Sequence, residues 1–115
     1  MILEGDHAVF NTSTGVKWFK EQWVAERSYI VQKEAYEIGI APPVFERIDN
    51  HSYRTGIASP LCCELGIDGN INAFQDLYDK IDKLFKKHGI KKVKNDFKTS
   101  NLGVWDNRIV FVDFS

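Results

Sequence analysis

Residues 94–102 read KNDFKTSNL, and residues 109–115 read IVFVDFS. In the first stretch Asp96 and Asn101 stand at the two ends of a short polar loop, and in the second Asp113 ends an apolar strand. An aspartate at the end of a buried strand is costly unless a partner balances its charge. Taken one at a time, these residues also fit ordinary turn positions and a solvated terminal acid. Their placement relative to one another therefore decides the interpretation.

A hairpin is expected to join the two stretches. Residues 102–105 and 108–112 have the composition of short strands, and residues 106–107 supply the turn. Such a hairpin folds Asp113 back beside Asn101 and gathers two carboxylates and an amide oxygen in one place. These hard oxygen donors suit Mg²⁺, which prefers a few protein oxygens together with waters and substrate phosphates. The sequence therefore predicts a magnesium site at this hairpin.

The rest of the chain predicts a mixture of strands and helices. The expected strands are residues 7–12, 15–19, 44–48 and 52–58, with a further extended stretch at 92–94. The expected helices are residues 20–38 and 72–88, which end at Gly39 and Gly89. This order predicts an α+β fold. We expect a single domain over residues 1–115, with a sheet-rich front lobe at about 1–58 and an abbreviated helical rear lobe at 59–115.

Each predicted helix has an apolar stripe along one side. In the first helix the stripe consists of Val24, Arg27, Val31, Ala35 and Ile38, with Trp23 and Ile30 beside it. In the second helix it consists of Phe74, Leu77, Tyr78, Ile81, Leu84 and Phe85.

Composition narrows the class of protein. A chain of 115 residues, of which 43% are hydrophobic, suffices for one compact core. The formal net charge of -1 gives no strong signal for nucleic-acid binding. No apolar run reaches the roughly 18–20 residues of a membrane helix, and the N-terminal residues lack the features of a signal peptide. The neighbouring Cys62 and Cys63 fit reduced thiols, so we expect a cytoplasmic protein.

The motif Asp-x-Lys-x-x-Asn at residues 96–101, followed by a hairpin and Asp-Phe-Ser, resembles the catalytic loop and metal-binding motif of protein kinases. Residues 95–101 are especially similar to the small atypical kinase of the KEOPS tRNA-modification complex. RIO kinases and aminoglycoside phosphotransferases are more distant relatives. The resemblance implies a minimal bilobal kinase-like fold, in which an antiparallel sheet with one helix faces a helical lobe that carries the catalytic-loop hairpin.

The front half resembles the same family in the residues that would bind the nucleotide. Residues 5–10, which begin with Gly5, are similar to the end of the nucleotide-covering loop. Lys17 takes the place of the strand lysine that binds the α- and β-phosphates. The following helix should supply a glutamate to orient that lysine, with Glu26 as first choice and Glu34 as fallback. Adenine would lie between the lobes, near Ala58.

The resemblance also assigns the chemistry. Asp96 would orient the attacking hydroxyl, and Lys98 would stabilise charge on the transferred phosphoryl group. Asn101 and Asp113 would hold Mg²⁺, while Lys17 anchors the phosphates of ATP. The implied cofactors are therefore ATP and Mg²⁺.

The sequence departs from the kinase pattern at several places. The glycine-rich loop is reduced to Gly5, Lys94 replaces the usual histidine before the catalytic loop, and Ser115 replaces the usual glycine. No activation segment follows, so we expect a minimal, truncated or decayed form. The apolar side of the 72–88 helix would then be exposed, and would be buried against a second copy or another protein.

Three functions follow from these expectations. The first is an ATP- and Mg²⁺-dependent phosphotransferase that acts on Ser/Thr of a protein or on itself. The second is a pseudokinase, or a kinase-mimicking module, that binds nucleotide or a protein partner without catalysis. The third is a small α+β interaction domain in which the match is accidental.

Overall fold

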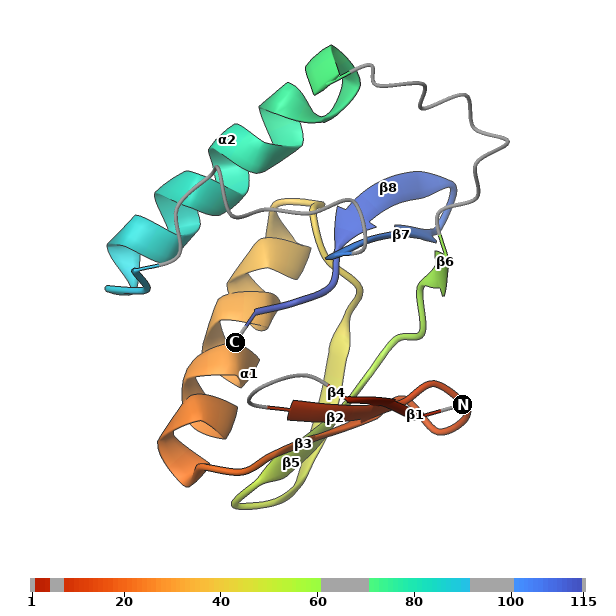
Figure 1. Cartoon of the computed structure of the whole chain (residues 1–115), viewed down its shortest axis with the longest axis vertical. Coiled ribbons are helices and arrows are strands. Elements are labelled where there is room, and N and C mark those ends of the chain that lie inside the picture. The colour runs from red at the N-terminus through yellow and green to blue at the C-terminus, as the bar shows by residue number, and fades with distance from the viewer. Residues whose placement is uncertain (1, 5–7, 61–70, 92–100, 115) are drawn as a thin grey trace.

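The structure is a computed structural model, and it describes residues 2–4, 8–60, 71–91 and 101–114 (Figure 1). The predicted site residues Gly5, Asp96 and Lys98, and the extended stretch 92–94, lie outside the described residues. The strands are β1 (Ile2–Glu4), β2 (Ala8–Asn11), β3 (Val16–Phe19), β4 (Val44–Asp49), β5 (Ser52–Thr55), β6 (Ser59–Pro60), β7 (Leu102–Trp105) and β8 (Arg108–Phe111). The helices are α1 (Gln22–Glu37) and α2 (Ile71–Lys87).

The first half of the chain forms an antiparallel sheet in the order β1-β2-β3-β5-β4. The two predicted hairpins, β2–β3 and β4–β5, are confirmed, although the predicted strand 52–58 ends at Thr55. Gly15 closes the β2–β3 turn at a φ of 77°, and a Cβ there would come within 2.4 Å of the Thr55 carbonyl oxygen. Only glycine fits this position, because both the left-handed backbone and the close approach exclude a side chain.

The second sheet has the order β6-β7-β8 and contains the predicted C-terminal hairpin. Its turn residues Asp106 and Asn107 have φ values of 51° and 62°. Two successive positive φ angles are typical of a two-residue type I′ turn, whose twist matches that of the flanking strands. The register pairs Leu102 with Phe111. Strand β6 was not predicted, because two residues that include a proline give no strand signal.

The buried face of α1 differs from the predicted stripe. Its buried residues are Val24, Ala25, Ser28, Val31, Gln32 and Ala35. Trp23, Ile30 and Ile38 are 57%, 55% and 51% exposed, so placing them on or beside the core stripe was wrong. The prediction took the most apolar side of the helix as the buried one. Two buried side chains, Ser28 and Gln32, are instead polar and make hydrogen bonds inside the protein. The helix ends at Glu37, and the predicted stop residue Gly39 follows with a φ of 81°.

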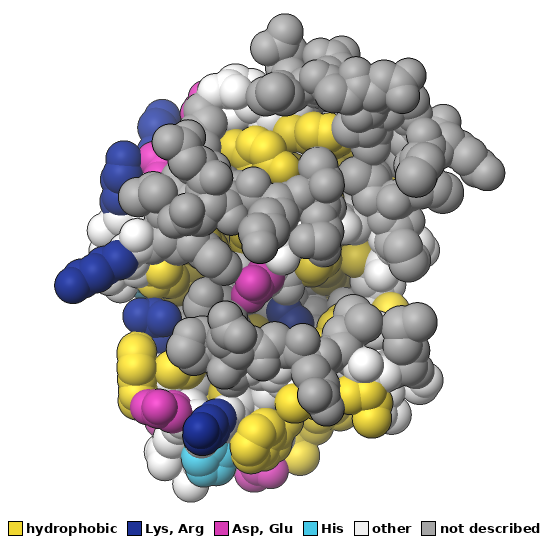
Figure 2. Space-filling view, viewed as in Figure 1, with side chains coloured by type: hydrophobic (Ala, Val, Ile, Leu, Met, Phe, Trp, Pro, Cys, Tyr) yellow, Lys and Arg dark blue, Asp and Glu magenta, His cyan; other side chains and the backbone are white. Residues whose placement is uncertain are grey.

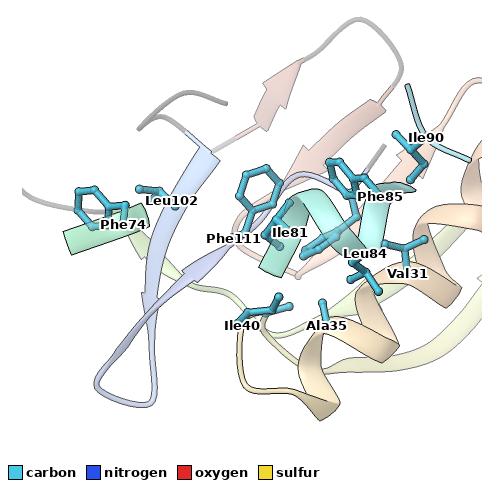
Figure 3. Packing of buried hydrophobic residues seen from close by; sticks show 12 residues of the cluster. Val31, Ala35, Ile40, Phe74, Ile81, Leu84, Phe85, Ile90, Leu102 and Phe111 are labelled. Atoms are coloured by element: carbon cyan, nitrogen blue, oxygen red, sulfur yellow. The ribbon is translucent and has the colours of Figure 1, made fainter. Parts of the chain in front are cut away.

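Helix α2 joins the main hydrophobic core (Figure 3). The cluster combines α1, α2 and the C-terminal hairpin, and consists of Val31, Ala35, Ile40, Ala41, Phe74, Ile81, Leu84, Phe85, Ile90, Leu102, Phe111 and Phe114. The rings of Phe85, Phe111 and Phe114 meet edge to face, with centroids 5.5–6.3 Å apart. The expectation that the apolar side of this helix is exposed is therefore wrong for its buried residues. The prediction of a dimer through this side rested on that exposure, so the reason for it no longer holds.

Within the described part of the chain, neither helix has the length and apolar character needed to cross a membrane.

Candidate functional site

Lys17 lies inside the protein, on the face of β3 that turns toward α1. It is 6% exposed, and it alternates with the exposed Trp18 along the strand. Its Nζ donates one hydrogen bond of 2.7 Å to the carbonyl oxygen of Val112 and another of 3.1 Å to Oε1 of Gln32. The predicted strand lysine therefore reaches across the molecule to the segment that follows β8.

Aromatic rings surround the Lys17 ammonium. The rings of Phe10, Tyr53 and Phe114 have their centroids 5.6, 5.9 and 5.8 Å from Nζ. Ring faces attract a cation, but less strongly than the water they replace. Burial accordingly lowers the pKa of Lys17 to about 8, and the negative charge of Asp113 acts in the opposite direction.

Asn101 and the segment that carries Asp113 pair through their backbones at the open end of the β7–β8 hairpin. The amide of Val112 donates a hydrogen bond of 2.8 Å to the backbone carbonyl oxygen of Asn101. One predicted metal ligand, Asn101, is therefore paired with the residue that directly precedes the other, Asp113. Both side chains are half-buried. Phe114 is 1% exposed and fixes the backbone directly after Asp113. The structure therefore brings Lys17 to the backbone segment at which residues 101 and 112 pair and which Asp113 follows. Figure 2 shows an acidic and a basic side chain in the recess between the upper and lower halves of this face.

The donor set fits a hard divalent cation. Among the described residues, no group of three or more His, Cys, Asp or Glu side chains could hold a metal ion. Mg²⁺ does not need such a cage, because it is commonly bound through one or two carboxylates and the phosphates of a substrate. One carboxylate from Asp113 and one amide oxygen from Asn101 match that requirement.

Glu26 does not pair with Lys17, so this prediction is wrong. Its side chain is exposed and accepts a hydrogen bond of 3.3 Å from Nε2 of Gln22 on the same helix. The fallback, Glu34, faces α2 and accepts hydrogen bonds from Lys87 and His88. Both glutamates lie outside the buried face of α1, which passes through Gln32 instead.

Gln32 is the hydrogen-bonding partner of Lys17 that sequence reasoning missed. Its Oε1 accepts from Lys17 and, at 2.8 Å, from the hydroxyl of Tyr53. Its Nε2 donates to Oγ1 of Thr55 at 2.7 Å and to the carbonyl oxygen of Pro42 at 3.1 Å. Helical spacing contained a signal, because Gln32 lies eight residues, about two turns, after the buried Val24. A polar residue was not expected at that position.

Tyr53 connects the network to the helix. Its hydroxyl lies 2.8 Å from Oγ of Ser28, and because Tyr53 gives its one proton to Gln32, Ser28 is the donor in that bond. Burial raises the pKa of Tyr53, so the phenol stays neutral at physiological pH. The polar groups beneath Lys17 therefore form a buried network that carries no charge of its own.

Ala58 lies where the chain passes from the first sheet to the second. Its Cβ would be 2.8 Å from a Cβ built at Gly103 on β7. The predicted adenine contact is therefore close to the hairpin that carries Asn101.

One hollow of the described surface lies elsewhere. It has a volume of about 550 Å³, and Tyr36, Glu37, Trp105 and Arg108 are among the side chains that line it. The lining includes none of the predicted site residues. Since no described group in the hollow points to a particular ligand, the buried cluster around Lys17 is the stronger candidate site.

Comparison of the chain with protein-family models, curated proteins and solved structures finds no match in any of the three.

Proposed function

We propose that this chain is an ATP- and Mg²⁺-dependent phosphotransferase of protein-kinase type, acting in the cytoplasm on Ser/Thr of a protein or on itself. One observation carries the proposal. Lys17 hydrogen-bonds the carbonyl of Val112, 95 positions away, and this bond places the ammonium beside Asp113 and Asn101. A buried cation, a carboxylate and an amide oxygen at the junction of two sheets are the groups that a metal-bound polyphosphate needs.

The order of the elements supports the proposal. The lysine of protein kinases lies on the third strand and is oriented from the helix that follows. Lys17 lies on β3, and α1 follows directly and contributes Gln32. Two lobes, over about residues 1–58 and 59–115, belong to the same proposal.

Each residue has a distinct role in the proposed reaction. Lys17 binds phosphate oxygens, and Asp113 and Asn101 hold Mg²⁺, which supplies charge neutralisation when bound. From the sequence motif, Asp96 orients the acceptor hydroxyl and Lys98 stabilises charge on the phosphoryl group. Positioning and electrostatic stabilisation account for most of the catalysis of phosphoryl transfer. These groups are therefore of the chemical types that the reaction requires.

A thermal-shift titration tests whether the nucleotide binds at this site. Wild type is melted with ATP in the presence and absence of Mg²⁺, beside Asp113→Ala and a matched control, Asp76→Ala, which removes an exposed carboxylate of α2. At a hundredfold excess of ligand over its dissociation constant, binding adds about 2.7 kcal/mol to the free energy of unfolding. We expect this Mg²⁺-dependent gain in wild type and in Asp76→Ala, and its loss in Asp113→Ala. An equal gain in all three proteins would place the nucleotide elsewhere.

The second candidate function is a pseudokinase that binds nucleotide without transferring phosphate. It is favoured by Gln32, which occupies the position where an active kinase of this type uses a glutamate. Asp96→Ala separates the two functions. For an enzyme, this variant should abolish phosphate transfer to a protein acceptor while ATP binding stays nearly unchanged. If the biological readout survives in Asp96→Ala, the catalytic proposal is wrong and the binding module remains.

A further inference from the structure

The amide of Gln32 has a fixed orientation, because both of its ends face groups with only one hydrogen-bonding role. On one side Lys17 can only donate, so the oxygen must point toward it. On the other side the carbonyl of Pro42 can only accept, so the nitrogen must point there. Tyr53 and Thr55 complete the pattern, at 2.8 Å on the oxygen and 2.7 Å on the nitrogen.

A carboxylate cannot replace this amide without a loss. Glutamate at position 32 would bring a second acceptor against the carbonyl oxygen of Pro42, where the structure now has a donor 3.1 Å away. Two acceptors facing each other in a buried site leave both without a proton, and that arrangement is expensive. The surroundings therefore select a neutral side chain at position 32.

The neutrality of Gln32 changes what Lys17 can do. The two described groups that accept hydrogen bonds from its Nζ, an amide oxygen and a backbone carbonyl, are both uncharged. Asp113 is the charged group that acts on Lys17 within the described part of the chain, and it is also the proposed Mg²⁺ ligand. Once a cation holds Asp113, the ammonium needs a new anion.

We propose that Gln32 is the positioning residue of Lys17, and that its neutrality reserves the lysine charge for the phosphate groups of the ligand. This inference rests on the proposed function and adds a selectivity to it. Affinity at the site depends on the phosphates of the nucleotide more than on its nucleoside.

Isothermal titration calorimetry with adenosine and with ADP, both in Mg²⁺, tests the inference. The measured quantity is the ratio of the two dissociation constants, which a general loss of stability would not change selectively. In Gln32→Glu the new carboxylate neutralises Lys17, so the preference for ADP should fall about tenfold or more, while adenosine binds as before. The control Gln22→Glu adds the same charge at an exposed position of the same helix, and should keep the wild-type ratio.

A second variant keeps the test decisive if Gln32→Glu does not fold. Tyr53→Phe preserves the shape of the ring and removes one of the two donors that hold the Gln32 oxygen. Its preference for ADP should fall severalfold, in the same direction. An unchanged or increased ratio in the folded variants would overturn the inference, as would equal binding of ADP and adenosine by wild type. If wild type binds neither compound, the proposed function itself is wrong and this inference fails with it.

Discussion

At the scale of single residues, the site depends on a lysine held away from water. Lys17 is buried among three aromatic rings, and its hydrogen bonds go to neutral acceptors. Protonated Lys17 therefore costs stability in the absence of an anion, because desolvation is only partly compensated. Such a cost is characteristic of a group whose environment serves a ligand more than the fold.

The cost predicts a measurable pH dependence. The pKa of Lys17 is lowered to about 8 in the folded protein from its ordinary value of 10.5, so between these values the unfolded chain binds more protons. Stability should therefore rise with pH through this window, by up to about 3 kcal/mol for this one group. Urea unfolding of wild type and Lys17→Met between pH 7 and pH 10.5 isolates this contribution. As pH rises, the free energy of unfolding of wild type should increase relative to that of Lys17→Met. Parallel curves would show that Lys17 is not desolvated.

Among single residues, the sequence was informative about those that belong to a recognisable motif. Lys17, Asn101 and Asp113 were identified from their motifs, and the structure places Lys17 against the backbone of Val112, which pairs with Asn101 and precedes Asp113. Gln32 was missed because the search was for a carboxylate, and because Trp23 and Ile30 made the wrong side of α1 look like the core. A buried polar network has no hydrophobic signature, so its members show only through the spacing of their apolar neighbours.

At the scale of elements, α1 and α2 are fastened to each other by an ionic contact as well as by the core. Glu34 on α1 accepts hydrogen bonds from Lys87 and, at 2.6 Å, from Nε2 of His88 at the end of α2. These two partners lower the pKa of Glu34. The fallback glutamate of the sequence analysis thus holds the two helices together and does not pair with Lys17.

Glu34→Gln tests this contact. A partly exposed ion pair is worth about 0.5–1 kcal/mol, so the variant should lose that much stability at pH 7. Because the folded pKa of Glu34 is depressed, its contribution is present above the ordinary carboxyl pKa and is lost as pH falls below it. In urea unfolding, the difference from wild type should be full at pH 7 and should shrink as the pH falls toward 3. As a control, Asp76→Asn breaks a pair with Lys80 inside α2 and should have a smaller effect.

At the scale of the whole molecule, one core joins the N-terminal and C-terminal halves. Val31 and Ala35 of α1 pack in the same cluster as Phe85 of α2 and Phe111 of β8. The α+β class and the order of the elements were predictable from periodicity and turn residues. The shared core was not, because the sequence alone suggested that the apolar side of α2 had no partner. Which faces meet is set by long-range packing, and no local pattern reports it.

A core that the two halves share predicts a single unfolding transition. Phe85→Ala removes a fully buried ring from the centre of the cluster and should cost about 3–5 kcal/mol. Urea unfolding followed by far-ultraviolet circular dichroism and by tryptophan fluorescence should give coincident curves in wild type, and both should shift together in the variant. Trp23→Ala, at an exposed position, is the matched control and should shift little. Separate transitions from the two probes would mean that the halves fold independently.

The two-residue turn at Asp106 and Asn107 has a consequence that reaches the far end of the hairpin. It fixes Phe111 opposite Leu102 and so decides which side chains of β8 point inward. If one residue were inserted there and the two-residue turn were kept, Val110 would take that place and every following side chain would change sides. The length of the turn therefore determines on which side of the hairpin the Asp113 carboxylate lies. An insertion in the turn should disrupt the candidate site as much as replacing Asp113 itself.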